Sequence, residues 1–234
     1  MKIAEQIKSD LQKIANPEKS KNLSRFFKTG KGEYGEGDQF LGITVPDQRI
    51  IAKKYFKEAT LEDVDILLKS PIHEHRLTSL FILCYKYTKS TEEYRKKIFD
   101  FYLDHLEFVN NWDMVDLSAE RIIGEYLLDK DRSLIYKLAK SDHLWTQRVS
   151  ILTTFQFIKN NDFADALKIS EYFLTSKHDL IQKASGWMLK EIGKRDVKPL
   201  IEFLDNHYKE MPRTMLRYCI EKLSDTQRKH YLGK

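Results

Sequence analysis

An indole and two carboxylates crowd the first turn of a predicted helix at residues 110–127. The segment reads NNWDMVDLSAERIIGEYL and carries Trp112, Asp113 and Asp116. On a helix, Trp112 and Asp116 are four positions apart and share a face, whereas Asp113 points about 100° away from Trp112. The two carboxylates therefore need not share a role.

The position of each aspartate suggests a different role. Asp113 lies in the first turn, where a negative charge interacts favourably with the helix dipole, and this structural role explains it without a function. Asp116 lies on the side of Trp112, between two apolar residues. It either pairs with a basic residue of a neighbouring helix or remains an anionic spot beside a ligand. Arg148, in LWTQRVS, could pair with Asp116 or bind a phosphate.

The two other tryptophans are predicted to pack by their local pattern. Trp187 follows Ala184, Ser185 and Gly186, small residues that allow close approach of helices, and the pattern alone predicts an indole in the core. Trp145 is an even stronger core candidate. The two cysteines, in FILCYKY and RYCIEKL, fall within apolar helical patterns and are predicted to be buried, unreactive thiols.

The sequence shows no metal or nucleotide motif in a suitable context. HEHR places His73 and His75 on opposite sides of a helix, and HExxH is absent, so we predict no metal site. GKGEYG matches the glycine pattern of dinucleotide-binding proteins, but that motif works only between a strand and a helix. Here it follows a helical segment and precedes none. We therefore expect no cofactor.

Composition suggests one globular protein of moderate positive charge. The chain has 234 residues, 41% hydrophobic and 32% charged, which is enough for one compact domain over residues 1–234. No apolar run is long enough for a membrane span or a signal peptide, so we expect a cytoplasmic monomer without membrane contact. The net charge of +5 favours an anionic partner such as nucleic acid without deciding it.

Apolar residues recur at spacings of three and four along nearly the whole chain, and no segment alternates with period two. This predicts an all-α protein of about twelve helices. Prolines preceded by Asn16, Val45 and Ser70 are expected in first turns, and capping boxes are expected at Ser90 with Glu93 and at Ser224 with Gln227. The main interruption, at residues 29–46, is rich in glycine and is predicted to be a loop.

Five of the predicted helices share a pattern in which a polar residue precedes small and apolar residues. Such irregular repeats are typical of helical hairpins related to the HEAT class, which bury one face by stacking on their neighbours. If the five helices are equivalent, they line one surface, and we expect a concave basic groove with a single acidic spot. The residues at the aligned position are Arg76, Asp116, Arg148, Lys183 and Arg213.

Four motifs, in order along the chain, resemble those of the AlkD-like DNA alkylation repair family of HEAT-like DNA glycosylases. They are FLGITVPDQRIIAKKY, NNWDMVD, LWTQRVSIL and LIQKASGWMLKEIGK, and the likeness spans residues 1–231. The resemblance implies an all-α, right-handed superhelical solenoid of helical hairpins. It also implies excision of positively charged N3- or N7-alkylated purines from double-stranded DNA, without a cofactor and without a base-binding pocket.

The resemblance assigns roles to four residues of this chain. It implies that Asp116 is the catalytic aspartate, that Trp112 and Trp187 contact the deoxyribose of the lesion, and that Arg148 lies in the DNA-binding groove. The repeat alignment adds Lys183 and Arg213 as DNA-binding candidates. The alternative is a non-catalytic helical-repeat module that binds DNA or protein, in which Asp116 pairs with Arg148 and the tryptophans only pack.

Overall fold

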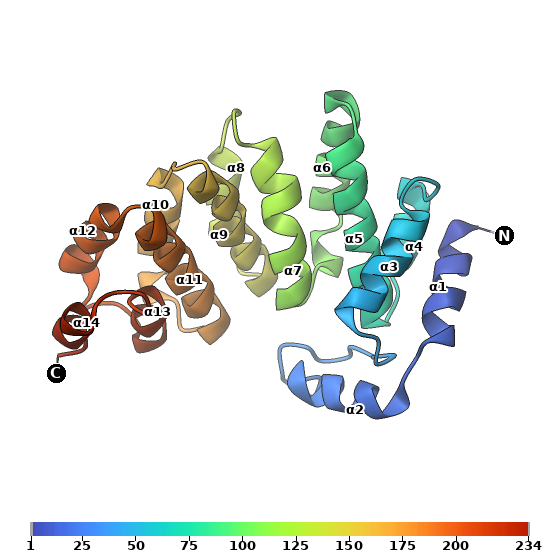
Figure 1. Cartoon of the computed structure of the whole chain (residues 1–234), viewed down its shortest axis with the longest axis horizontal. Coiled ribbons are helices and arrows are strands. Elements are labelled where there is room, and N and C mark those ends of the chain that lie inside the picture. The colour runs from blue at the N-terminus through green and yellow to red at the C-terminus, as the bar shows by residue number, and fades with distance from the viewer. Residues whose placement is uncertain (1, 234) are drawn as a thin grey trace. The chain divides into compact units, whose positions relative to one another are not determined.

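A computed structural model describes residues 2–233 of the chain (Figure 1). Within these residues the protein is 72% helical, with fourteen α-helices and no strand. The all-α prediction is therefore confirmed, with more helices than the predicted twelve. The chain contacts divide into two compact units, one ending at Ser118 and the other beginning at Ala119. The prediction of a single domain over residues 1–234 stays a prediction.

Unit 1 is built around α5, which packs against α3, α4 and α6, while α1 covers α3 and α4. The side chains of Leu80, Ile82 and Leu83 in α5 are completely buried. The helices of this unit are α1 (Ile3–Lys13), α2 (Pro17–Phe26), α3 (Val45–Tyr55), α4 (Leu61–Leu68), α5 (His73–Lys89), α6 (Glu92–Asp104) and α7 (Trp112–Ala119), the last residue of α7 belonging to unit 2.

Helix starts follow the predicted signals in part. Asn16 caps α2 and accepts a hydrogen bond from the backbone of Lys19, while Pro17 occupies the first turn. Pro46 lies in the first turn of α3, as predicted. The prediction at Ser70 is wrong, because α5 begins only at His73, after Pro71. The capping box at Ser90 is also wrong, because the next residue, Thr91, caps α6.

The predicted loop at residues 29–46 is confirmed as far as residue 44, since α3 already begins at Val45. Gly42 adopts a φ of +83°, and a Cβ there would lie 2.1 Å from the backbone oxygen of Asn16. Only glycine fits this close approach between the loop and the start of α2. The loop also forms an isolated bridge between Gln39 and Ile72, just before α5.

Unit 2 repeats the hairpin arrangement that the sequence pattern predicts. Within it, α11 packs against both α9 and α13, so the last three of the five similar segments are neighbours (Figure 1). Ser224 and Gln227 form the predicted capping box of the final helix. The helices are α8 (Ser133–Ala139), α9 (Leu144–Lys159), α10 (Ala164–Tyr172), α11 (Asp179–Arg195), α12 (Val197–His207), α13 (Arg213–Cys219) and α14 (Asp225–Leu232).

A π-helical turn, Glu120–Gly124, directly follows α7. Gly124 lies against α9, where a Cβ would be 2.6 Å from the backbone oxygen of Thr153. The predicted helix at residues 110–127 is therefore present, but its period changes in the middle. No helix within residues 2–233 combines the length and apolar character needed to cross a lipid bilayer.

We expect Gly186→Ala to destabilise unit 2, because Gly186 is the contact point of α11 with α13. A Cβ at this position would lie 2.5 Å from the backbone oxygen of Met215, which cannot move without shifting α13. The free energy of unfolding, measured by urea denaturation, should fall by roughly 1–3 kcal/mol.

Gly193→Ala is the matched control in the same helix. Its Cβ would meet only the side chain of Leu200, which can change its rotamer. This variant should lose less stability than Gly186→Ala, because alanine also favours the helical conformation. Equal losses in the two variants would contradict a tight backbone contact at Gly186.

Candidate functional site

The first turn of α7 is fixed by two side-chain contacts with its own backbone. Asn111, which is completely buried, accepts a hydrogen bond from the backbone N–H of Trp112 at 2.8 Å. Asp113 Oδ1 accepts one from the backbone N–H of Met114, also at 2.8 Å. These bonds satisfy N–H groups that a helix start leaves unpaired, and Asp113 lies in the first turn of α7 as predicted.

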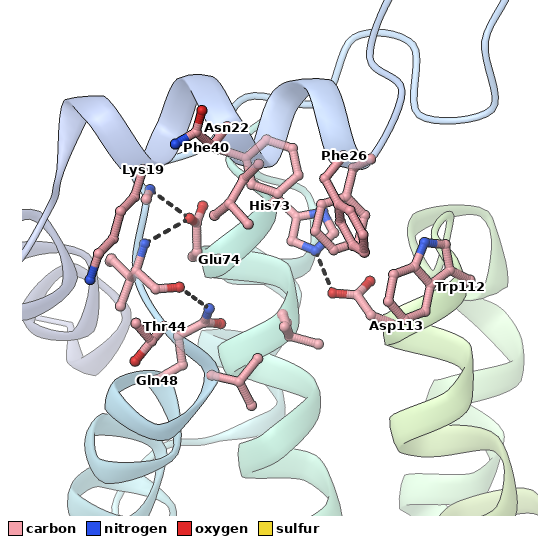
Figure 2. A pocket seen from close by; sticks show the side chains of 16 residues that line it. Lys19, Asn22, Phe26, Phe40, Thr44, Gln48, His73, Glu74, Trp112 and Asp113 are labelled. Atoms are coloured by element: carbon pink, nitrogen blue, oxygen red, sulfur yellow. Dashed lines mark hydrogen bonds and ion pairs between the residues drawn. The ribbon is translucent and has the colours of Figure 1, made fainter.

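The HEHR segment at the start of α5 is buried and joins three parts of unit 1. The His73 imidazole bonds to Asp38 of the loop through Nδ1, at 2.9 Å. Through Nε2 it bonds to Asp113 of α7, at 2.8 Å (Figure 2). Arg76 donates to the other oxygen of Asp38, at 2.5 Å. We call Asp38, His73, Arg76 and Asp113 the charged cluster.

Glu74 fixes the end of the glycine-rich loop. Its carboxylate is 1% exposed and accepts hydrogen bonds from three successive backbone N–H groups, at 2.9, 2.8 and 3.2 Å. These groups belong to Leu41, Gly42 and Ile43. A buried carboxylate is tolerated here because its oxygens are satisfied by charge-assisted bonds. The loop is therefore anchored to α5 at two places, through Asp38 and through Glu74.

The neighbouring charges determine the protonation states of His73 and Asp38. Burial of His73 would by itself lower the pKa of the imidazole, but Asp113 and Asp38 outweigh burial and raise that pKa to about 9. Burial would likewise raise the pKa of Asp38, yet its bonds to His73 and the charge of Arg76 lower it below the ordinary value. At neutral pH the imidazole is therefore a cation between two carboxylates.

Aromatic rings surround the imidazole of His73 and extend to Trp112. The ring of Phe40 is stacked on His73, with centroids 4.5 Å apart, and Phe27 lies 4.9 Å from the same imidazole. Phe27 is in turn stacked on Trp112 at 5.2 Å, and Phe26 meets the indole edge-on at 5.9 Å. The electron-rich faces of these rings favour the protonated form of His73. One side of the Trp112 indole is thus packed within unit 1.

A cavity of about 510 Å³ lies in unit 1 between α2 and the starts of α3, α5 and α7 (Figure 2). Most of its wall is apolar, and it is bordered by both Trp112 and Asp113. No residue pattern indicated this cavity, because its wall comes from segments far apart in the sequence. The side chains facing it include Lys19, Asn22, Leu23, Phe26, Phe27, Phe40, Leu77 and Trp112.

Asp116 lies on α7 between two buried residues and is itself half-buried, as is Trp112. Its charge reaches Tyr102, a buried tyrosine whose hydroxyl bonds to Ser118 at 2.8 Å. Burial raises the pKa of Tyr102, and the negative charge of Asp116 adds to that shift. Tyr102 is therefore a neutral neighbour of Asp116.

Trp187 and Trp145 lie in unit 2. Trp145 is 5% exposed, which confirms its prediction as a core residue. Trp187 is only half-buried, so the core position predicted from its small neighbours is correct for part of the ring. Its Nε1 donates to Glu191 at 3.0 Å, and its ring centroid lies 5.6 Å from that of Phe155. The remaining exposed part of the indole is accessible to a ligand.

The predicted basic residues differ in accessibility. Arg213 is exposed on α13, and Lys183 is half-buried and forms an ion pair with Asp179 at 2.6 Å. Arg148 is 5% exposed and donates to the backbone oxygen of Leu180 at 2.6 Å, while Arg76 is 4% exposed within the charged cluster. The expectation that all four cations line an open surface is therefore wrong for Arg76 and Arg148. The predicted pairing of Asp116 with Arg148 stays a prediction.

The sequence reasoning missed Asp38 and Glu74 altogether, and it missed the contacts that join His73 to Asp38 and Asp113. It considered the two histidines of HEHR only as possible metal ligands and Arg76 only as a groove cation. The signal that could have identified HEHR is the occurrence of four polar residues at a helix start directly followed by a long apolar run. Within residues 2–233, no group of three or more His, Cys, Asp or Glu side chains is arranged to hold a metal ion.

Comparison with known proteins shows a family and several solved structures that this chain resembles. The sequence profile of a family described as DNA alkylation repair enzyme matches residues 7–223. No curated protein sequence matches the chain significantly. Among solved structures, a predicted DNA alkylation repair enzyme from Enterococcus faecalis is similar, with 17% identity, 90% of this chain and 97% of that chain covered, and a TM-score of 0.71.

AlkD2 from Streptococcus mutans is also similar in fold, with 16% identity, 89% of this chain and 98% of that chain covered, and a TM-score of 0.58. The structure of smu.31 from Streptococcus mutans UA159 covers 88% of this chain and 100% of that chain, at 16% identity and a TM-score of 0.56. At these identities the solved structures support the helical-repeat fold.

The charged cluster predicts a loss of stability in mildly alkaline solution. Because the pKa of His73 is higher in the folded protein than its ordinary value of 6.5, the folded state binds this proton more tightly. The stabilisation is complete below about pH 6.5 and is lost as the pH rises through about 9. Urea denaturation over this range should show a decrease on the order of 3 kcal/mol.

Asp113→Asn provides the comparison. It removes one of the two carboxylates that hold the proton on His73, so the decrease in stability with pH should become smaller and shift to lower pH. Identical pH profiles for this variant and the native chain would contradict the assignment of the proton to His73.

Proposed function

Since the chain belongs to the DNA alkylation repair enzyme family, we propose that it is a DNA glycosylase that excises positively charged N3- or N7-alkylated purines from duplex DNA. The reaction is hydrolysis. The bond between C1′ of the deoxyribose and the purine nitrogen breaks, the purine keeps the electron pair, and water adds to C1′ with loss of a proton. The products are a free neutral base and an abasic site.

The substrate determines what the protein must supply. An alkylated purine that already carries a positive charge leaves as a neutral molecule, so no acid is needed to protonate it. Positive charge instead develops on the sugar as the bond breaks. A nearby anion is therefore the main requirement.

Asp116 is our candidate for that anion. At an effective dielectric constant near 20, a carboxylate about 4 Å from the developing cation stabilises it by roughly 4 kcal/mol, equivalent to about a thousandfold in rate. The same carboxylate can orient the attacking water and take up its proton. No cofactor is required for these steps.

The single observation that supports this proposal best is the joint presentation of Trp112 and Asp116. They share a face of α7, both are half-buried, and the start of that helix is fixed by Asn111 and Asp113. An indole face beside a carboxylate suits a sugar that is becoming cationic. The half-buried Trp187 of unit 2 is the second indole that we propose to contact the deoxyribose.

The basic residues are proposed to contact the DNA backbone to different extents. Arg213 is exposed and ready to bind a phosphate. Lys183 can exchange its ion pair with Asp179 for one with a phosphate, since surface pairs contribute little. Arg148 is buried and already donates to Leu180, so we propose that it contributes less to affinity than Arg213.

One observation favours a second candidate, a non-catalytic DNA-binding module. The indole of Trp112 is stacked on Phe27 and contacts Phe26, as expected of a packing residue. In this alternative Asp116 has a structural role as well. Excision activity distinguishes the two candidates.

We expect Asp116→Asn to abolish most excision while leaving binding intact. The substitution preserves shape and removes charge, so single-turnover release of N7-methylguanine from duplex DNA should fall on the order of 10²- to 10³-fold. Affinity for the same DNA should hold or rise slightly, because a negative charge near the phosphates is removed. Free base is quantified beside an uncatalysed reaction.

Asp129→Asn is the control for this experiment. Its side chain is 82% exposed and pairs only with the neighbouring Lys130 among the ion pairs described in residues 2–233. The control should excise like the native chain. No release above the uncatalysed rate by the native protein, on N7-methylguanine or N3-methyladenine, would falsify the glycosylase proposal and leave the binding module.

A phosphate contact of Arg213 is tested by the salt dependence of DNA binding. The logarithm of affinity should fall linearly with the logarithm of salt concentration, and Arg213→Ala should reduce the steepness of that slope by about 0.9. Arg195→Ala, which removes an exposed arginine at the C-terminal end of α11, should leave the slope unchanged. Equal slopes for the native chain and Arg213→Ala would exclude this contact.

A further inference from the structure

His73 bonds to two other segments of unit 1 at once. Its two ring nitrogens reach Asp38 of the glycine-rich loop and Asp113 of α7, at 2.9 and 2.8 Å. Only a doubly protonated imidazole can donate a hydrogen bond to both carboxylates. A neutral imidazole would turn a lone pair toward one of them, and that contact would become repulsive.

The bond to Asp113 acts on the part of α7 that carries the proposed site. Asp113 follows Trp112 directly and precedes Asp116 by less than one helical turn. Because a helix turns as a unit over such a short distance, fixing the side chain of Asp113 fixes the direction in which Trp112 and Asp116 point. The ring of Phe27 adds a second link, since it lies against both His73 and Trp112.

The charges around His73 balance only when it is protonated. Facing it are Asp38 from the loop and Asp113 from α7, while Arg76 of the same helix α5 pairs with Asp38. Glu74, the next residue of α5, directs its carboxylate to backbone N–H groups of the loop instead. The neutral Asn111, just before α7, also donates to Asp38, and the rings of Phe27 and Phe40 lie against the imidazole. Two carboxylates thus face two cations, and loss of the His73 proton leaves a buried excess negative charge.

We propose that His73 is a positioning residue, whose protonated imidazole clamps the glycine-rich loop to the first turn of α7 and so sets the orientation of Trp112 and Asp116. The clamp itself follows from the contacts of unit 1. Its effect on catalysis rests on the proposed glycosylase function. Deprotonation of His73 loosens α7 from the loop, and the carboxylate of Asp116 is then no longer held where charge develops.

The first experiment observes the clamp without using activity. Histidine-labelled protein is titrated by NMR over roughly pH 6–10, and the His73 imidazole is identified by its loss in His73→Gln. We expect a midpoint near 9. In Asp113→Asn the midpoint should fall, because one carboxylate partner is gone. A midpoint below about 7 in the native chain would overturn the proposal, since the imidazole would then be neutral under ordinary conditions.

The same titration is followed at Trp112. In protein labelled with 5-fluorotryptophan, the Trp112 signal is identified by its loss in Trp112→Phe. This signal should shift with the same midpoint as His73 and should not titrate in His73→Gln. The signal of Trp145, buried in unit 2, should remain constant and serves as the internal control. A Trp112 signal insensitive to the His73 titration would show that the clamp does not reach the indole.

The second experiment measures excision from saturated complexes with N7-methylguanine DNA. The native rate should fall as the pH rises through the His73 midpoint, while the rate of His73→Gln should be flat there and roughly ten- to a hundredfold lower at neutral pH. Affinity for DNA should change little, since His73 is buried and offers almost no surface to a ligand. A structural role alone would lower stability and leave the rate of the folded fraction unchanged.

His105→Gln is the matched control, because His105 also bonds to an aspartate, Asp65, at 2.7 Å, but holds α6 rather than α7. It should keep the native pH profile of excision. If the native chain excises no base, the proposed function fails, whereas the linked titrations of His73 and Trp112 still test the clamp. If it excises with a rate independent of the His73 proton, the positioning role is wrong and the proposed function stands.

Discussion

The neutral balance of two carboxylates and two cations in the charged cluster is the constraint on which unit 1 depends. Asp38, His73, Arg76 and Asp113 come from three separate segments, and each of their charges is paired with an opposite charge from another segment. The balance brings the loop, α5 and α7 to one place. The aromatic rings around His73 form a chain of contacts that reaches Trp112. The geometry of the proposed site is therefore a consequence of charge neutralisation below it.

The residues that we propose to act on DNA differ from the residues that hold them in place. Asp116 and Trp112, which we propose to act, are half-buried and retain access to a ligand. Those that hold them, such as His73 and Asn111, are buried and hydrogen-bonded to other segments or to the helix start. Because the start of α7 is held in place by buried residues, Asp116 need not rearrange when positive charge develops on the sugar. A carboxylate that is already in position stabilises that charge most effectively.

The fold was largely predictable from the sequence, and the proposed site only in part. Helical periodicity is a local property, so the all-α architecture and the caps at Asn16 and Ser224 could be recognised directly. The ion pair between His73 and Asp113 joins residues 40 positions apart, and no local pattern encodes it. Burial of Arg148 likewise depends on the backbone of Leu180, which offers no side-chain signal. Polar contacts between residues far apart in the chain could not be predicted from a single sequence.

Among the helices of unit 1, α2 is the least tightly packed. It contains no fully buried residue and covers the cavity beside Trp112, whereas the loop that follows it is anchored through Glu74. Opening α2 alone would expose little apolar surface, so its amide hydrogens should exchange with solvent through a local event of low free energy, independent of global unfolding. The anchored loop would limit how far the opened segment travels. We therefore expect α2 to unfold locally, next to the indole that we propose to touch DNA.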